Sequence, residues 1–143
     1  MRPAFDAAAT YGGGVFVLAL TSNVEGATIQ HARAADGRTV AQTVIDEISQ
    51  LNAGAQPLGS VGAVVGATIG DTGHDFSAMN GPLLAPGLGA QGAGPADLRR
   101  VFGASMRNVL PSYSREVLAG GPQVAGLQAA AGRAADAVRA ALG

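Results

Sequence analysis

Short apolar runs alternate along the chain with longer segments of mixed character. Four of these runs have the length of strands, and they lie at residues 15–20, 59–69, 82–86 and 107–111. The first, VFVLAL, contains no polar residue, which is typical of a strand that is covered on both faces and is parallel to its neighbours. The sequence therefore predicts four strands of a mainly parallel sheet.

Helical periodicity is found between the strand-like runs. Apolar residues recur every three or four positions from Arg38 to Leu51, while Asp46, Glu47 and Gln50 mark the opposite face. Further helices are predicted at 3–11, from Pro95 to 103, from 111 to the glycines 120 and 121, and from 124 to the end. Residues 21–26 and 70–80 are predicted as loops, the second with one helical turn near 75–79.

Strands that alternate with helices predict βα units, so the fold class is α/β with parallel strands. A complete (β/α)8 TIM barrel takes about 250 residues. Four units in 143 residues fit the carboxyl-terminal half of such a barrel, with residues 1–143 as one partial domain. A small open, doubly wound sheet is the alternative, and periodicity does not choose between them. In half a barrel the first and fourth strands would be unpaired edges, which promote pairing and aggregation.

Composition narrows the possible partners and chemistry. The net charge is −1 and only 13% of residues are charged, so no basic surface for nucleic acid is expected. No leader and no apolar run long enough to span a membrane is evident. The chain has no cysteine, which fits a cytoplasmic location and excludes thiolate metal sites. It also has no lysine, so no ammonium group or Schiff base can come from a side chain.

A glycine-rich segment is the most distinctive local feature. In LAPGLGAQGAGPADLRR, residues 84–100, four glycines fall within eight positions and surround Gln91, just before a predicted helix. Glycines allow backbone N–H groups to come close to an anion, and a helix amino terminus favours negative charge. The segment therefore predicts a phosphate-binding loop.

Four segments in order resemble orotidine 5'-phosphate decarboxylase, in the carboxyl-terminal half of its bacterial long form. They are VFVLALTSNVEGATIQHA, GRTVAQTVIDEI, GSVGAVVGATI and NVLPSYSREVLAGGP, with PGLGAQG at residues 86–92 as the phosphate loop. The resemblance implies a TIM barrel that converts orotidine 5'-monophosphate (OMP) to uridine 5'-monophosphate (UMP) and carbon dioxide in pyrimidine biosynthesis, without a cofactor or a metal. It also implies an amino-terminal half or a homodimeric partner.

The resemblance assigns roles to four residues. Gln91 would contact the substrate phosphate and the pyrimidine, Gly92 would donate its backbone N–H to the phosphate, and Arg115 would bind the phosphate with its guanidinium. Ser22 would hydrogen-bond the pyrimidine ring. Val24 replaces the proline expected after Asn23. Independently of the family, the loops after strands seven and eight of a barrel commonly bind phosphate.

The catalytic part of the family pattern is absent from this sequence. The family uses an Asp-x-Lys-x-x-Asp segment, whose lysine protonates the carbanion in a fixed electrostatic field, and this chain has no lysine. A non-catalytic phosphate- or nucleotide-binding module, or a relic without a ligand, is therefore the alternative. A half-barrel of histidine or tryptophan biosynthesis is a third reading, which would make the TSN and SYSREVL matches coincidences.

Asp71, His74 and Asp75 form a polar cluster that could suggest a metal site. Their spacing matches no common metal motif, so the sequence favours a polar loop with a helix N-cap. His31, in a segment rich in Arg and Ala, is expected to face solvent.

Overall fold

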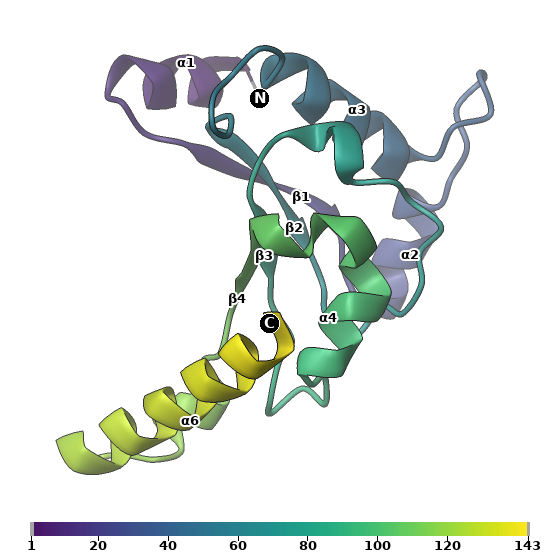
Figure 1. Ribbon diagram of the computed structural model, residues 1–143. Helices are drawn as coiled ribbons and strands as arrows, with labels where there is room; N and C mark the ends of the chain where they lie inside the picture. The colour runs from purple at the N-terminus through teal and green to yellow at the C-terminus, as the bar shows by residue number, and fades with distance from the viewer. Residues whose placement is uncertain (1, 143) are drawn as a thin grey trace.

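Four parallel strands form a single sheet in the computed structural model, which describes residues 2–142 (Figure 1). The strands are β1 (Val15–Leu20), β2 (Val61–Val65), β3 (Leu83–Ala85) and β4 (Val109–Pro111). They lie in the order β1-β2-β3-β4, and each neighbouring pair is parallel. A doubly wound sheet would place later strands on both sides of the first. This sheet winds in one direction, as the wall of a barrel does.

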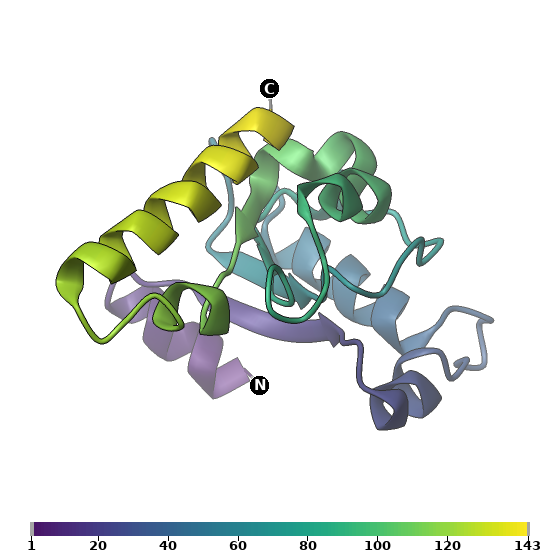
Figure 2. The ribbon, with the colours of Figure 1, turned by 90° about the horizontal axis from the view of Figure 1, so that it is seen from below.

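Helices connect and cover these strands. They are α1 (Arg2–Thr10), α2 (Val24–Gln30), α3 (Val40–Leu51), α4 (Pro95–Phe102), α5 (Arg115–Leu118) and α6 (Val124–Leu142), with two short 3-10 helices, η1 (Ser77–Met79) and η2 (Gly103–Asn108). Viewed from below, α6 extends away from the body of the molecule and approaches α4 only near its carboxyl end (Figure 2).

The core lies between one face of the sheet and the helices α3 and α4. From the sheet come Val17, Ala63, Val65, Leu83 and Ala85, and from the helices Ala41, Ile45, Ile48, Leu98, Val101 and Phe102. The helical residues recur at the spacing that places them on one side of each helix. We call this the covered face of the sheet, and Leu83 at its centre is 0% exposed.

The opposite face of the sheet is apolar as well, but less protected. Successive side chains of a strand point to opposite faces, and the register aligns Leu18 with Val64, Val64 with Leu84, and Leu84 with Leu110. Leu18 is 61% exposed and Leu110 is 48% exposed. We call this row of four residues the open face. Its two exposed leucines lie on β1 and β4, which are the edge strands predicted from the sequence.

A buried asparagine fixes the end of α3 against the start of β2. Asn52 is 1% exposed, and its Nδ2 donates to the carbonyls of Val61 at 2.8 Å and Met79 at 3.0 Å. Its Oδ1 accepts the N–H of Val61 at 3.2 Å. The side chain thereby satisfies backbone groups that would otherwise be buried without partners.

The structure corrects the prediction that residues 21–26 form a loop, because α2 begins at Val24. Glu25 in its first turn is favourable near a helix amino terminus. Gly26 lies inside the helix, where a Cβ would come within 2.7 Å of both Thr21 Oγ1 and Asn23 Oδ1. The absence of a side chain at Gly26 therefore makes room for a polar network.

The strands are shorter than the apolar runs that predicted them. The run at 59–69 contains a strand only at Val61–Val65, and the last strand spans Val109–Pro111. Beyond the end of β2, Ala67 donates its N–H to the carbonyl of Pro86 at 2.8 Å. The continued apolar character reflects burial of the connecting segment, since Ala67 is 0% exposed. The single helical turn expected near 75–79 is confirmed as η1.

Candidate functional site

The four loops that follow the strands meet at one edge of the sheet, because all the strands run in the same direction. In barrels this carboxyl-terminal edge carries the binding residues. The candidate residues follow three of these strands: Ser22 comes after β1, Gln91 and Gly92 come after β3, and Arg115 begins α5 after β4.

The loop after β3 is folded tightly on itself. Gly89 donates its N–H to the carbonyl of Ala93 at 2.9 Å, and Ala93 donates to the carbonyl of Gly87 at 3.3 Å. Gly89 and Gly92 have φ of 68° and 97°, a region that side chains disfavour. A Cβ at Gly89 would also overlap the Glu116 carboxylate. The glycines therefore allow both the backbone turns and the close approach of α5.

Gln91 and Arg115 line the same hollow. It measures about 40 Å³, and its wall consists of Pro86, Gly87, Leu88, Ala90, Gln91, Ser112, Ser114 and Arg115. We call it the glutamine hollow. Both Gln91 and Arg115 are exposed, and no ion pair within residues 2–142 involves Arg115. A guanidinium beside an amide can grip a phosphate or a carboxylate through several hydrogen bonds.

Two anion-binding groups expected from the sequence already have partners. The N–H of Gly92 donates to the carbonyl of Gly89 at 2.7 Å, so it would bind a phosphate only after exchanging that bond. The N–H of Gly94, at the amino terminus of α4, donates to the Asp97 carboxylate at 2.8 Å. This helix terminus therefore already has a negative group of its own, and its binding of an anion stays a prediction.

Ser22 lies in a second, larger hollow at the ends of β1 and β2. It measures about 470 Å³, and its wall includes Ser22, Asn23, Ala27, His31, Thr68, Ile69, Asp71 and Thr72. We call it the serine hollow. A Cβ on Gly87, in the wall of the glutamine hollow, would lie 3.6 Å from Thr68 Cγ2. The two hollows are therefore neighbours, with Thr68 beside both.

A polar network holds the segment around Ser22. Thr21 donates its N–H to Gln30 Oε1 at 3.0 Å, and Gln30 Nε2 donates to Thr21 Oγ1 at 2.7 Å. The Thr21 hydroxyl also bonds the Asn23 side chain, which in turn contacts Glu25 at 3.3 Å. These hydrogen bonds join the end of β1 to α2, on either side of Val24. Sequence analysis missed Thr21 and Gln30, because their contact depends on the unpredicted helix α2.

The polar cluster at Asp71, His74 and Asp75 lies in an irregular loop, as the sequence predicted, but the N-cap of η1 is Phe76 and none of these three residues. Asp71 Oδ1 accepts the N–H of Gly73 at 3.0 Å, and Asp75 Oδ1 accepts the N–H of Ser77 at 2.8 Å. The bond from Ser77 holds the pKa of Asp75 below its usual value. Within residues 2–142, no group of three His or acidic side chains could hold a metal ion.

His31 is exposed, as the sequence predicted. Its ring centroid lies 6.1 Å from that of His74.

Tyr113 lies in the loop that follows β4. Burial raises the pKa of its hydroxyl, and the negative charge of Glu116 raises this pKa further. Tyr113 therefore stays protonated beside α5.

Comparison with known proteins agrees with this geometry. A family model described as "Orotidine 5'-phosphate decarboxylase / HUMPS family" matches residues 1–130. The chain belongs to this family. Among the curated relatives, orotidine 5'-phosphate decarboxylases of Salinispora arenicola and Streptomyces coelicolor are 74% and 56% identical over 142 residues. These matches cover 99% of the chain and 51% of each relative, so the chain spans about half their length.

Solved structures give the same picture. A crystal structure described as an orotidine 5'-phosphate decarboxylase from Streptomyces avermitilis superposes with a TM-score of 0.93 at 58% identity. That match covers 99% of this chain and 50% of the other. The OMP decarboxylase of Leishmania donovani gives a TM-score of 0.66 at 28% identity, over 90% of this chain and 48% of that one. The fold is thus the carboxyl-terminal half of a TIM barrel, and the open-sheet alternative is wrong. No helix within residues 2–142 has the length and hydropathy to cross a membrane.

Proposed function

We propose that this chain supplies the phosphate and pyrimidine subsites of an enzyme that decarboxylates OMP to UMP and carbon dioxide. The observation that carries the proposal is that Gln91 and Arg115 line one hollow at the ends of neighbouring strands. Membership of the family supplies the substrate class. The serine hollow lies next to the glutamine hollow and is proposed to bind the pyrimidine base.

Each candidate residue is proposed to bind a particular part of the substrate. Arg115 presents a permanently charged guanidinium that can form two hydrogen bonds to phosphate oxygens. Gln91 carries both a donor and an acceptor, so it can join the phosphate to the pyrimidine edge. Ser22 is proposed to hydrogen-bond the pyrimidine from the adjoining hollow. Gly92 is proposed as a further donor once its bond to Gly89 is exchanged.

Phosphate binding would contribute to rate as well as to affinity. Binding energy from a part of the substrate that does not react can be used to orient and desolvate the part that does. The chain itself has no lysine, so the proton donor of the family chemistry would have to come from outside it. We therefore propose that catalysis requires a second polypeptide segment, either an amino-terminal half or another copy carrying one. No cofactor or metal is proposed. Nucleic acid and membranes are not expected partners, and the cytoplasmic location stays a prediction.

Titration calorimetry with UMP and with uridine tests the binding proposal. UMP should bind, and uridine should bind more weakly because it lacks the phosphate. Arg115→Ala should weaken UMP binding about 10- to 100-fold, since a hydrogen bond to a charged group contributes about 1.5–3 kcal/mol. Gln91→Ala should weaken it by a smaller factor.

Two substitutions serve as matched controls. Arg107→Ala removes an exposed guanidinium just before β4, at the opposite end of the strand from Arg115. Gln128→Ala removes an exposed amide on α6. Neither should change the affinity. If UMP does not bind the folded chain, or if the controls weaken binding as much as Arg115→Ala, the proposed site is wrong and a relic without a ligand is favoured.

A further inference from the structure

Residues 70–75, which follow β2, form one wall of the serine hollow but are held by few backbone hydrogen bonds. Asp71 and Thr72 of this segment line the hollow. Within residues 70–75 the structure shows no hydrogen bond from backbone to backbone. Two local bonds instead join side chains to the backbone, from Gly73 N–H to Asp71 and from His74 N–H to Thr72 Oγ1 at 3.2 Å. Such a segment needs an external contact to hold a fixed position.

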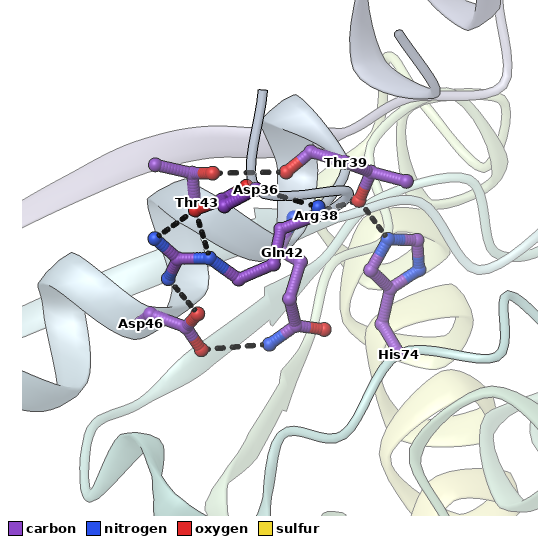
Figure 3. Close-up of polar contacts among 7 residues, drawn as sticks. All are labelled: Asp36, Arg38, Thr39, Gln42, Thr43, Asp46 and His74. Atoms are coloured by element: carbon purple, nitrogen blue, oxygen red, sulfur yellow. Dashed lines mark hydrogen bonds and ion pairs between the residues drawn. The ribbon is translucent and has the colours of Figure 1, made fainter. Parts of the chain in front are cut away.

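That contact is a hydrogen bond between His74 and Thr39. His74 Nε2 lies 2.9 Å from Thr39 Oγ1 (Figure 3). Within the described chain it is the single side-chain hydrogen bond that joins residues 70–75 to a distant element. Thr39 caps the amino terminus of α3, where its Oγ1 accepts the N–H of Gln42 at 3.0 Å. Because α3 packs against β1 and β2, the bond anchors the segment to the rigid core.

The chemistry of this bond favours a neutral imidazole. His74 Nδ1 is buried and has no hydrogen-bond partner. A neutral ring leaves a single uncharged group unsatisfied there, whereas a protonated ring would bury a charged N–H without an acceptor. Burial accordingly lowers the pKa of His74 below 6.5. The hydrogen bond with Thr72 opposes this lowering, and the neighbouring His31 adds a smaller lowering effect.

The side chains around His74 are mostly basic. His31, Arg33 and Arg38 share a hollow with it on the α3 side, and Arg38 is paired with Asp36 and Asp46 (Figure 3). On the opposite side the wall includes Asp75 and Arg100. Asp75 already accepts a bond from Ser77, and Arg100 is paired with Asp97. No carboxylate in these hollows contacts the imidazole within the part of the chain described, so none would stabilise its charge.

We propose that His74 is a positioning residue that, through Thr39, fixes residues 70–75 as a wall of the serine hollow. The neutral ring fits this buried position beside Thr39. Protonation would place a charged Nδ1–H there without an acceptor, so the ring leaves Thr39 and the segment is released. The effect on UMP binding rests on the proposed function, whereas the effect on the segment itself does not. The sign follows from the lowered pKa: the contact is complete above pH 6.5 and is lost as the pH falls through the pKa of the folded state.

Nuclear magnetic resonance of the whole chain between pH 5 and 8 tests the first part. Backbone order parameters report the mobility of residues 70–75, and His31→Asn assigns the two imidazole signals. The wild-type segment should become more mobile at low pH. Thr39→Val should loosen it at every pH, and Thr39→Ser should restore the wild-type behaviour.

His74→Gln provides the sharpest variant, because its amide can reach the position of Nε2 but does not titrate. The segment should then stay ordered across the whole pH range. If His74→Gln keeps the wild-type pH dependence, or if Thr39→Val leaves the segment as ordered as in the wild type, the positioning role is refuted. These readouts need no ligand.

UMP affinity tests the consequence for binding. The second pKa of a phosphate monoester is about 6, so the ligand titrates in the same range, and wild type must be compared with His74→Gln at each pH. Wild-type affinity should fall several-fold relative to His74→Gln between pH 7.5 and 5.5. An unchanged ratio would overturn this consequence. A failure of UMP to bind either protein would instead refute the proposed function and leave the result on the segment intact.

Discussion

The covered and open faces of the sheet are built from similar residues but lie in different surroundings. Leu83 on the covered face is 0% exposed, whereas Leu18 and Leu110 on the open face are 61% and 48% exposed. The strands were predicted from apolar runs, and such runs indicate burial on both sides. In this chain one face is buried, whereas the other is only partly buried at Val64 and Leu84 and exposed at Leu18 and Leu110. Because the chain spans about half of its relatives, we infer that the open face is made to be covered by the other half of a barrel.

The largest expected effect comes from truncating a leucine on the covered face. Leu83→Ala should lower the free energy of unfolding by about 2–5 kcal/mol, because it leaves a cavity in a fully buried site. Leu84→Ala, the neighbouring residue on the open face, should cost clearly less. Urea unfolding followed by circular dichroism measures both. Equal losses would mean that the two faces are equally packed.

Loss of the buried amide of Asn52 should have the next largest effect. Asn52→Ala leaves a buried N–H and two carbonyls without this partner, which costs about 1–3 kcal/mol for each group left unsatisfied. Gln50→Ala, on the exposed side of the same helix, is the control and should stay within about 0.5 kcal/mol. The same urea titration distinguishes the two variants. If Asn52→Ala left the free energy of unfolding unchanged, the amide would be shown to be dispensable.

Charges on the open face should change stability least and association most. In Leu18→Glu and Leu110→Glu the new carboxylates can face water, so the free energy of unfolding should change by less than about 1 kcal/mol. They should reduce self-association, since charged side chains protect exposed strand edges. Sedimentation at several concentrations measures this. A wild-type chain that stays monomeric at high concentration would contradict the inference that the edge strands β1 and β4 and the open face promote association.

Local patterns in the sequence predicted most of the fold. The four strands follow from apolar runs, and α3 follows from its periodicity. The helix α2 was missed, because residues 21–26 were predicted as a loop. Gly26 lies within this helix and makes room for the side chains of Thr21 and Asn23. The strand order was open because periodicity within a strand carries no information about its neighbours.

The candidate site was predictable only in part. Gln91 and Arg115 could be proposed from the glycine-rich segment and the family resemblance. The hydrogen bond from Gly94 to Asp97 at the start of α4 could have been predicted from the sequence GPAD at 94–97, where an acidic residue follows the N-cap by three positions. The contact between Thr39 and His74 could not, because it joins residues 35 positions apart and depends on how two loops pack.

The most direct test combines this chain with the part of the Salinispora arenicola relative that it does not span, and measures carbon dioxide release from OMP. The mixture should decarboxylate OMP, the chain alone should show no enzyme-like rate, and Arg115→Ala should strongly reduce the activity of the mixture. Turnover by the purified chain alone, or a mixture whose activity is insensitive to Arg115→Ala, would contradict the account of this chain as the phosphate-binding half of the enzyme.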